Sequence, residues 1–113
     1  MICSPFVVVE VPFPFSDLPR AKMRKALVLS AKEFNRINGN TILMMITSAP
    51  QSEWLMDTPI IDLSEAGLKK PCVARLKLFT IDNGLIVKQV GELSKSDQTS
   101  VLKSIRSAVP AFA

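Results

Sequence analysis

The segment Cys72–Ile81 constrains the fold most, because its side chains alternate along the chain as a β-strand requires. One set of alternate positions is apolar and comprises Cys72, Ala74, Leu76 and Leu78, and the other set comprises Val73, Arg75, Lys77 and Phe79. Successive side chains of a strand point to opposite faces, so the pattern predicts a strand with one face on a core. Such a strand is stable only with neighbours, and the chain therefore has to build a sheet.

Short runs of β-branched and aliphatic residues predict the other strands. They are Phe6–Val11, Ala26–Ser30, Thr41–Thr47, Thr58–Leu63 and Leu85–Val90. Pro12 is expected to stop the first run, because proline has no N–H to donate to a sheet. The polar, basic residues Ser16–Lys25 are expected to form a loop, and Asn38-Gly39 is a strong signal for a hairpin before the third run.

The C-terminal region predicts one helix. Ser94 can cap its start, and Asp97 stands at the position that answers a cap. Apolar residues then recur at helical spacing, at Val101, Leu102, Ile105 and Val109, before Pro110 ends the helix. Several short strands and one closing helix predict a single, mainly β domain over residues 1–113, in the form of a small antiparallel barrel.

The absence of histidine limits the chemistry that this chain can perform. It excludes Ser-His-Asp and Cys-His catalytic sites, and with them most catalytic metal sites. The two cysteines, Cys3 and Cys72, are far apart and have no ligand-like neighbours, which argues against a zinc site. We therefore expect no metal and no other cofactor, and chemistry that depends on Arg, Lys, Thr, Ser or carboxylates.

The charge of the chain suits a polyanionic partner. The formal net charge is +4 and the sequence pI is near 9.3, as is common for proteins that bind nucleic acid or an acidic protein. The segment Met1–Val11 is apolar but lacks the basic start and the cleavage site of a secretion signal. No apolar run reaches the length that spans a bilayer, so we expect a cytoplasmic protein without a membrane partner.

Three stretches, in order along nearly the whole chain, carry a resemblance to a known family. The first joins Val9–Asp17 to Lys22–Ser30, where the family has a strand, a loop and then Arg-Pro-Ala-Leu-Val-Leu-Ser. The second is Met45–Ser48. The third runs from Trp54 through Ile60–Leu63, Ala66–Leu68 and Val73–Asp82 to Gly91–Ser94. In their joint order and spacing they resemble the MazF/PemK toxins of type II toxin–antitoxin systems.

This resemblance implies an SH3-like barrel of the CcdB/MazF type with a C-terminal helix, usually as a homodimer. It implies a metal-independent, sequence-specific endoribonuclease that cuts single-stranded RNA such as mRNA to 2′,3′-cyclic phosphate and 5′-hydroxyl ends. It also implies inhibition by a cognate acidic antitoxin. The family's catalytic Arg and Thr match Arg24 and Thr47. A guanidinium can hold two phosphate oxygens in one plane, and a threonine can orient the reacting groups.

The match departs from the family beside the catalytic arginine. The family's Arg-Arg-Pro reads Met23-Arg24-Lys25 in this chain, and Cys72 stands where a Ser is common. Lys25 keeps a positive charge, but it has neither the planar fork of Arg nor the preset backbone of Pro. The departure predicts weakened cleavage on an intact fold.

Further residues are candidates for binding RNA. They are Lys22, Lys25, Ser48, Arg75 and Lys77. Arg75 and Lys77 are two residues apart on a predicted strand, which places them on one face and about 6.5–7 Å apart. That spacing suits successive phosphates of an RNA backbone, and it equally suits a solvated face with ordinary charges.

The role of Trp54 and two alternatives to the nuclease remain open. Trp54 can stack on a base or pack in the core or a dimer, and we favour packing. A CcdB-like gyrase poison shares the fold and cuts nothing, but its Trp-Gly-Ile ending is absent from Val109–Ala113. A non-catalytic relative that still binds an antitoxin is favoured by the loss of Arg-Arg-Pro.

Overall fold

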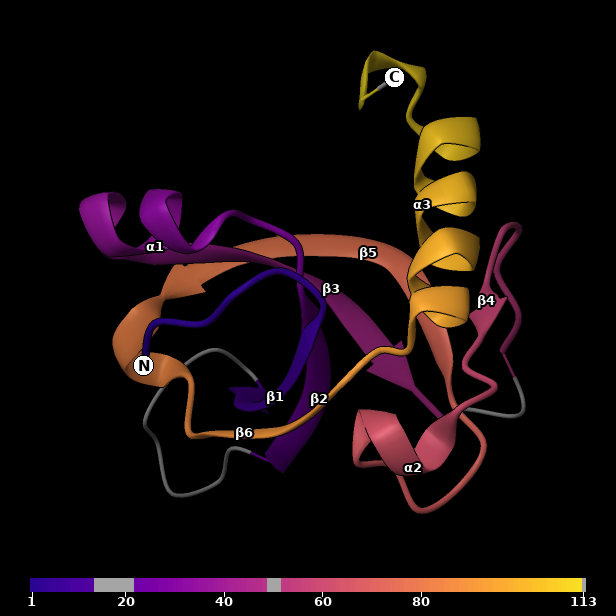
Figure 1. Ribbon diagram of the computed structural model, residues 1–113, viewed down its shortest axis with the longest axis horizontal. Helices are drawn as coiled ribbons and strands as arrows, with labels where there is room; N and C mark the ends of the chain where they lie inside the picture. Colours follow the sequence, from indigo (N-terminus) through magenta and orange to yellow (C-terminus); the bar gives the residue numbers. More distant parts are fainter. Residues whose placement is uncertain (14–21, 49–51, 113) are drawn as a thin grey trace.

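The computed structural model describes residues 1–13, 22–48 and 52–112, which form one antiparallel sheet with helices around it (Figure 1). The strands are β1 (Val7–Phe13), β2 (Lys22–Val28), β3 (Asn40–Thr47), β4 (Thr58–Pro59), β5 (Val73–Asp82) and β6 (Lys88–Glu92). The helices are α1 (Lys32–Asn38), α2 (Leu63–Ala66) and α3 (Lys95–Ala108), with 3-10 turns η1 (Asn83–Leu85) and η2 (Pro110–Phe112). The predicted mainly β fold with a C-terminal helix is confirmed.

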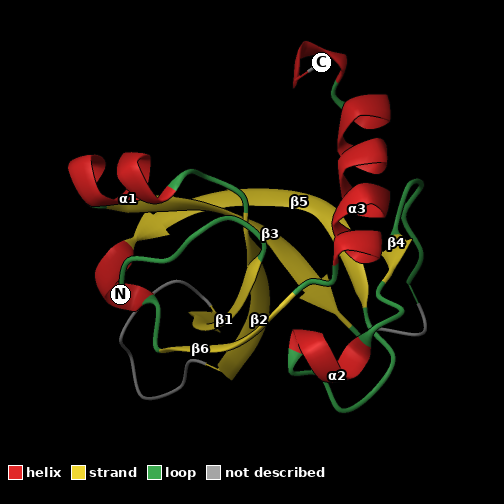
Figure 2. Ribbon diagram, in the orientation of Figure 1, coloured by secondary structure: helices red, strands yellow, loops and turns green. Residues whose placement is uncertain are grey.

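The sheet is strongly curled, and α3 stands against one side of it (Figure 2). Its strand order is β4-β5-β3-β2-β1-β6, and every neighbouring pair is antiparallel. Within the described residues, the edge strands β4 and β6 do not pair with each other. The sheet is therefore a half-barrel, and the helices close the space that a full barrel would enclose with strands.

The apolar residues divide into two cores, one on each face of the sheet. The core beneath α2 and α3 contains Val8, Leu27, Met44, Ile46, Ile60, Ala66, Leu68, Ala74, Leu93, Val101 and Ile105. The core on the other face contains Cys3, Val7, Val9, Val11, Ala26, Val28, Leu43, Ile81 and Ile86. Consecutive residues of β1 and β2 thus go to opposite cores, as alternation along a strand requires.

The start of α3 is fixed by a cap and by a buried acid. The Ser94 hydroxyl accepts a hydrogen bond from the Asp97 backbone N–H, so the predicted cap is confirmed. Asp97 is 1% exposed, and its carboxylate is used for other contacts than the cap. It accepts hydrogen bonds from the backbone N–H groups of Ile61 at 3.1 Å and Asp62 at 2.9 Å. This carboxylate therefore joins α3 to the segment between β4 and α2.

The hairpin predicted at Asn38-Gly39 is wrong, because α1 connects β2 to β3. Gly39 has a φ of +67°, and its backbone N–H donates to the Asn35 carbonyl to end the helix. A glycine with positive φ serves a hairpin turn and a helix end equally well, so the dipeptide signal could not separate the two.

The prediction that Pro12 stops the first strand is also wrong. β1 continues to Phe13, and Pro12 lies opposite Met23 of β2. The Glu10 carbonyl accepts the Val87 N–H on the β6 side, and pairing with β6 ends there. Pro12 lies two residues after Glu10, so its backbone N and O face the same side as those of Glu10, beyond the last pair with β6. The missing N–H of the proline therefore costs β1 no recorded sheet hydrogen bond.

Other boundaries differ from those predicted. Lys22–Lys25 belong to β2 rather than to a loop, and the remainder of that predicted loop, residues 16–21, lies outside the described residues. The predicted strand Thr58–Leu63 shortens to β4. No helix in the described ranges has both the length and the apolar character needed to cross a membrane.

Candidate functional site

Arg24 and Thr47 lie at the same end of two adjacent strands. The observed pairing of β2 with β3 ends with Lys25 opposite Ile46, and one more step in this register sets Arg24 opposite Thr47. Opposed residues of antiparallel strands project from the same face of the sheet. Arg24 is exposed and Thr47 is half-buried. The residues that follow the last recorded pair on the two strands are therefore the two that the family resemblance pairs.

Lys25 points to the opposite face from Arg24. Its Nζ lies 2.7 Å from Oε1 of Glu10, the residue opposite it on β1. The hydrogen bond from Lys25 holds the pKa of Glu10 below its usual value, although partial burial of that carboxyl opposes the effect. Lys22 is exposed at the start of β2. The predicted RNA contacts of β2 are therefore divided between the two faces.

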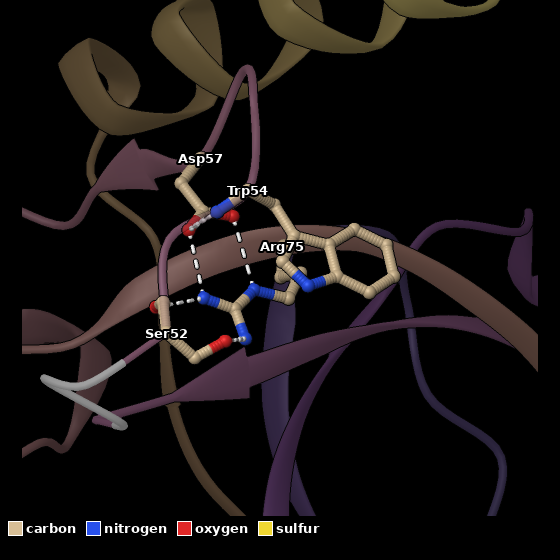
Figure 3. A network of polar contacts seen from close by, with 4 residues as sticks. All are labelled: Ser52, Trp54, Asp57 and Arg75. Carbon is tan, nitrogen blue, oxygen red and sulfur yellow. Dashed lines mark hydrogen bonds and ion pairs between the residues drawn. The ribbon is translucent and has the colours of Figure 1, made fainter.

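Arg75 is tied into a network that pins the segment after β3 to β5 (Figure 3). Its Nη2 donates to Oδ2 of Asp57 at 2.8 Å and to the Ser52 carbonyl at 2.7 Å, while its Nε donates to Oδ1 of Asp57 at 3.1 Å. The Trp54 ring centroid lies 5.4 Å from the guanidinium carbon, within the range of a cation–π contact. These contacts leave Arg75 only 6% exposed.

The ion pair between Arg75 and Asp57 shifts the pKa of both groups. The hydrogen bond from Arg75 is the main cause that holds the pKa of Asp57 below its usual value, and the Trp54 N–H adds to the effect. The pKa of Arg75 is raised by the same carboxylate. Arg75 is therefore a fixed, compensated cation within the protein, and not a surface cation.

Lys77 does not continue a row of cations with Arg75. The pairing of β3 with β5 shifts between Met44, which lies opposite Leu78, and Met45, which lies opposite Arg75. Two residues of β5, Leu76 and Lys77, bulge out of the pairing at this point. Because the bulge interrupts the alternation, Arg75 is buried while Lys77 is exposed. The shared solvated face expected for these two residues is absent.

A groove of about 1360 Å³, here named the first groove, begins at Thr47. Its walls are the segment after β3, β4, the start of α2 and the segment before β5. Ser48, Trp54, Leu55, Ile61 and Cys72 are among its lining residues. Arg24 is not among the described residues that line it. The lining combines hydroxyl groups, one indole, several apolar side chains and the charged residues Glu53, Asp57 and Lys70. It suits a ligand with both flat apolar and hydrogen-bonding groups.

The described residues contain no cluster of three or more His, Cys, Asp or Glu side chains placed to hold a metal ion. Cys3 is buried, and Cys72 is half-buried at the first groove. Burial raises the pKa of the Cys72 thiol, so a thiolate is disfavoured there. The chemistry that the site offers is anion stabilisation by a guanidinium, hydrogen bonding by hydroxyl groups and stacking on an indole.

Asp57 and Ser52 were not identified from the sequence, although they hold the wall of the first groove through Arg75. Asp57 lies 18 residues from Arg75 in a polar segment, and nothing in its local pattern indicates a partner. The one sequence signal was the presence of a cation on a largely apolar strand, because a buried cation requires an acid nearby.

Comparison with family models gives one match over most of the chain. Residues 5–109 match the family described as PemK-like, MazF-like toxin of type II toxin-antitoxin system. A comparison with curated protein sequences gives no match.

Solved structures match the fold. MazF-mt6, a toxin of Mycobacterium tuberculosis, has a TM-score of 0.74 and 19% identity, covering 92% of this chain and 96% of its own. A mycobacterial endoribonuclease in complex with its cognate antitoxin has a TM-score of 0.72 and 12% identity, with coverages of 96% and 94%. MazF of Deinococcus radiodurans has a TM-score of 0.73 and 18% identity, with coverages of 97% and 98%. At these identities the likeness establishes the fold.

Proposed function

The chain belongs to the PemK-like, MazF-like toxin family of type II toxin–antitoxin systems, and from this premise we propose that it is a toxin that cuts single-stranded RNA in the cytoplasm without a metal ion. One observation supports the proposal: β2 and β3 pair as far as Lys25 and Ile46, and the next residues along the two strands are Arg24 and Thr47. This is the pair that the family resemblance assigns to catalysis. A solved relative with the same fold is itself an endoribonuclease.

The proposed reaction uses the RNA's own nucleophile. The ribose 2′-oxygen attacks the adjacent phosphorus and loses its proton, a new 2′-O–P bond forms, and the bond to the 5′-oxygen breaks. The departing 5′-oxygen gains a proton, which leaves a 2′,3′-cyclic phosphate and a 5′-hydroxyl. Arg24 stabilises the charge that develops on the phosphate oxygens, and Thr47 orients the reacting groups by hydrogen bonding.

Neither residue is an effective base. A guanidinium stays protonated at neutral pH, and a threonine hydroxyl is a weak acid, so proton removal is left to water. The rate enhancement then comes from positioning and from electrostatic stabilisation. We therefore expect a modest enzyme, with Lys22 and Ser48 as the neighbouring contacts to RNA.

The proposal includes two protein partners, an acidic antitoxin and a second copy of the chain. Solved relatives with this fold include an endoribonuclease bound to its cognate antitoxin and a MazE-MazF structure. Leu55 and Ile61 at the first groove are 87% and 72% exposed, and apolar surface of this kind favours a protein contact. Sedimentation at tens of micromolar, a range that detects weak dimers, tests the homodimer.

A second candidate function is a relative that binds antitoxin without cutting. It is favoured by one observation, that Arg24 is absent from the described lining of the first groove while Thr47 is part of it. The same candidate accounts for the Met23 and Lys25 departures on either side of Arg24.

The deciding experiment incubates the purified protein with a long RNA in the presence of EDTA and identifies the product ends. The nuclease proposal expects cleavage with 2′,3′-cyclic phosphate ends, reduced about 10²-fold or more in Arg24→Ala. Arg106→Ala, which removes an exposed arginine of α3, is the matched control and should cut like wild type. Cleavage only with added magnesium contradicts the proposal, and no cleavage of any RNA favours the second candidate.

A further inference from the structure

A second groove, of about 680 Å³, is lined by four lysines. They are Lys25, Lys69, Lys70 and Lys88, and the only described acid among the lining residues is Glu10. Its other lining residues are small, apolar or neutral, and no aromatic residue or arginine is present among those described. Four ammonium groups around one depression create a strongly positive potential, which favours a polyanion.

The fold places these lysines on two opposing walls. On the sheet, Glu10 of β1 lies directly between Lys25 of β2 and Lys88 of β6, so the three residues form a row across three strands. Glu10 binds Lys25 at 2.7 Å and compensates one of the two charges. Lys69 and Lys70 supply the opposite wall, on the segment that follows α2.

The wall that carries Lys69 and Lys70 is held firmly against β6. Gly67 ends α2 with a φ of +74°, and a Cβ at this residue would lie 2.0 Å from the Val90 carbonyl oxygen. A Cβ at Gly91 would likewise lie 2.3 Å from the Ala66 carbonyl carbon. The backbones of α2 and β6 therefore touch, and the lysines that follow Gly67 are presented from a fixed position.

The second groove is continuous with the first. Lys70 and Cys72 line both of them, so one surface runs from Trp54 and Thr47 to Lys88. Burial raises the pKa of the Cys72 thiol, and the positive charges of Lys70 and Lys25 act in the opposite direction and lower it. Lys70 lines both grooves, and Lys25 lines the second groove.

We propose that a single RNA strand bound at Thr47 continues past Lys70 and Cys72 into the second groove, where the lysines bind its backbone phosphates. This inference rests on the proposed nuclease function and adds an anchoring site remote from the cut. Ammonium groups on flexible stems contact phosphates as point charges without reading bases, so the site adds affinity without sequence preference. Interfaces for protein partners are depleted in lysine and enriched in aromatic residues and arginine, which is the reverse of this lining.

The test measures binding of 2′-O-methyl RNA, which cannot be cut because its nucleophile is blocked. Two fluorescein-labelled oligonucleotides of mixed sequence, about 4 and about 16 nucleotides long, span the range of single-strand site sizes. The variant is Lys69→Gln/Lys88→Gln. Its matched control is Lys32→Gln/Lys103→Gln, which makes the same charge change at exposed lysines outside both grooves. Fluorescence anisotropy gives the Kd over a range of salt concentrations.

The expected result is a loss of about tenfold in affinity for the long RNA in the groove variant, and a smaller loss for the short RNA. The slope of log K against log salt should fall by about 1.4 for two lost phosphate contacts to a single strand. The control should keep the wild-type slope, and equal urea midpoints for the two variants exclude unfolding as the cause.

Three outcomes overturn the inference. If the groove variant binds long RNA with the wild-type Kd and slope, the anchoring site is wrong while the nuclease proposal stands. Poly-glutamate, measured in the same way, represents an acidic protein partner. If the groove variant keeps the wild-type affinity for RNA but loses affinity for poly-glutamate, the second groove belongs to such a partner. If the wild-type protein binds neither RNA, the proposed function fails together with the inference.

Discussion

Both carboxylate oxygens of Asp57 bind the guanidinium of Arg75, at 2.8 and 3.1 Å, in a bidentate pair that is almost fully enclosed. The pair joins β5 to the segment that leads into β4, and Trp54 lies against it. That segment is a wall of the first groove. The shape of the groove therefore depends on an ion pair between residues whose own side chains are hardly exposed.

The first prediction concerns the pH dependence of this pair. Arg75 lowers the pKa of Asp57 in the folded state below the unfolded value of about 3.9. The stabilisation is therefore complete above about pH 5 and is lost as the pH falls through the lower folded pKa. Urea unfolding from pH 7 to about 2.5 should show Asp57→Asn less stable than wild type at pH 7 and nearly equal to it at the acid end. Exposed Glu92→Gln is the control, and a pH-independent difference for Asp57→Asn would contradict the argument.

The second prediction concerns the buried carboxylate of Asp97. Asp97→Ala removes the acceptor for the N–H groups of Ile61 and Asp62, and each orphaned N–H costs about 1–3 kcal/mol. We expect the free energy of unfolding to fall by about 2–4 kcal/mol, measured by urea titration. Asp97→Asn keeps one acceptor oxygen and should lose less, while exposed Ser96→Ala should lose little. A loss below about 1 kcal/mol in Asp97→Ala would rule out this role.

The third prediction compares two glycines that end helices with similar positive φ. A Cβ at Gly39 meets nothing within 4 Å, whereas a Cβ at Gly67 would overlap the Val90 carbonyl. Gly39→Ala should therefore cost only the left-handed conformation, about 1–2 kcal/mol. Gly67→Ala should cost clearly more, because α2 must separate from β6. Thermal unfolding of both variants checks the order, and equal losses would show that the close approach is unimportant.

The fourth prediction uses the only tryptophan of the chain, Trp54, as a reporter. Trp54 is 45% exposed and lines the first groove, with the Arg75 guanidinium within cation–π distance of its ring. A base that enters the groove can stack on it, so saturating 2′-O-methyl RNA should quench its emission. Trp54→Phe should weaken RNA binding only slightly, and Trp54→Ala should weaken it by about 1–3 kcal/mol. Unchanged emission when anisotropy shows saturation would place the RNA elsewhere.

The strongly patterned parts of the fold could be predicted from the sequence. β5 and α3 have the clear periods of a strand and a helix, and a capping serine marks the first residue of α3. These signals are local, because each depends on residues that are neighbours along the chain. The same local reasoning failed at Gly39, because a hairpin turn and a helix end both need a positive φ. It also failed at Pro12, because its missing N–H faces the side on which β1 is no longer paired.

The candidate pair at the site came only from a family pattern, and it stays a prediction. Arg24 and Thr47 are 23 positions apart in the numbering, and no periodicity joins them. The burial of Arg75 could not be read locally either, because it depends on Asp57 in a different segment and on a bulge opposite Met44 and Met45. Long-range pairing and bulges are properties of the assembled sheet, which a single strand does not encode.

The division of Arg24 and Lys25 between two faces has a consequence for evolutionary drift. If β2 slipped by one residue against β1 and β3, every side chain of the strand would exchange faces. The guanidinium would then enter the second groove, the ammonium group would take its place beside Thr47, and Ala26 and Leu27 would exchange cores. Insertions and deletions inside this strand therefore abolish both surfaces at once, whereas point substitutions can alter either surface alone. A substitution at Lys25 therefore alters the second groove and leaves the face of Arg24 in place.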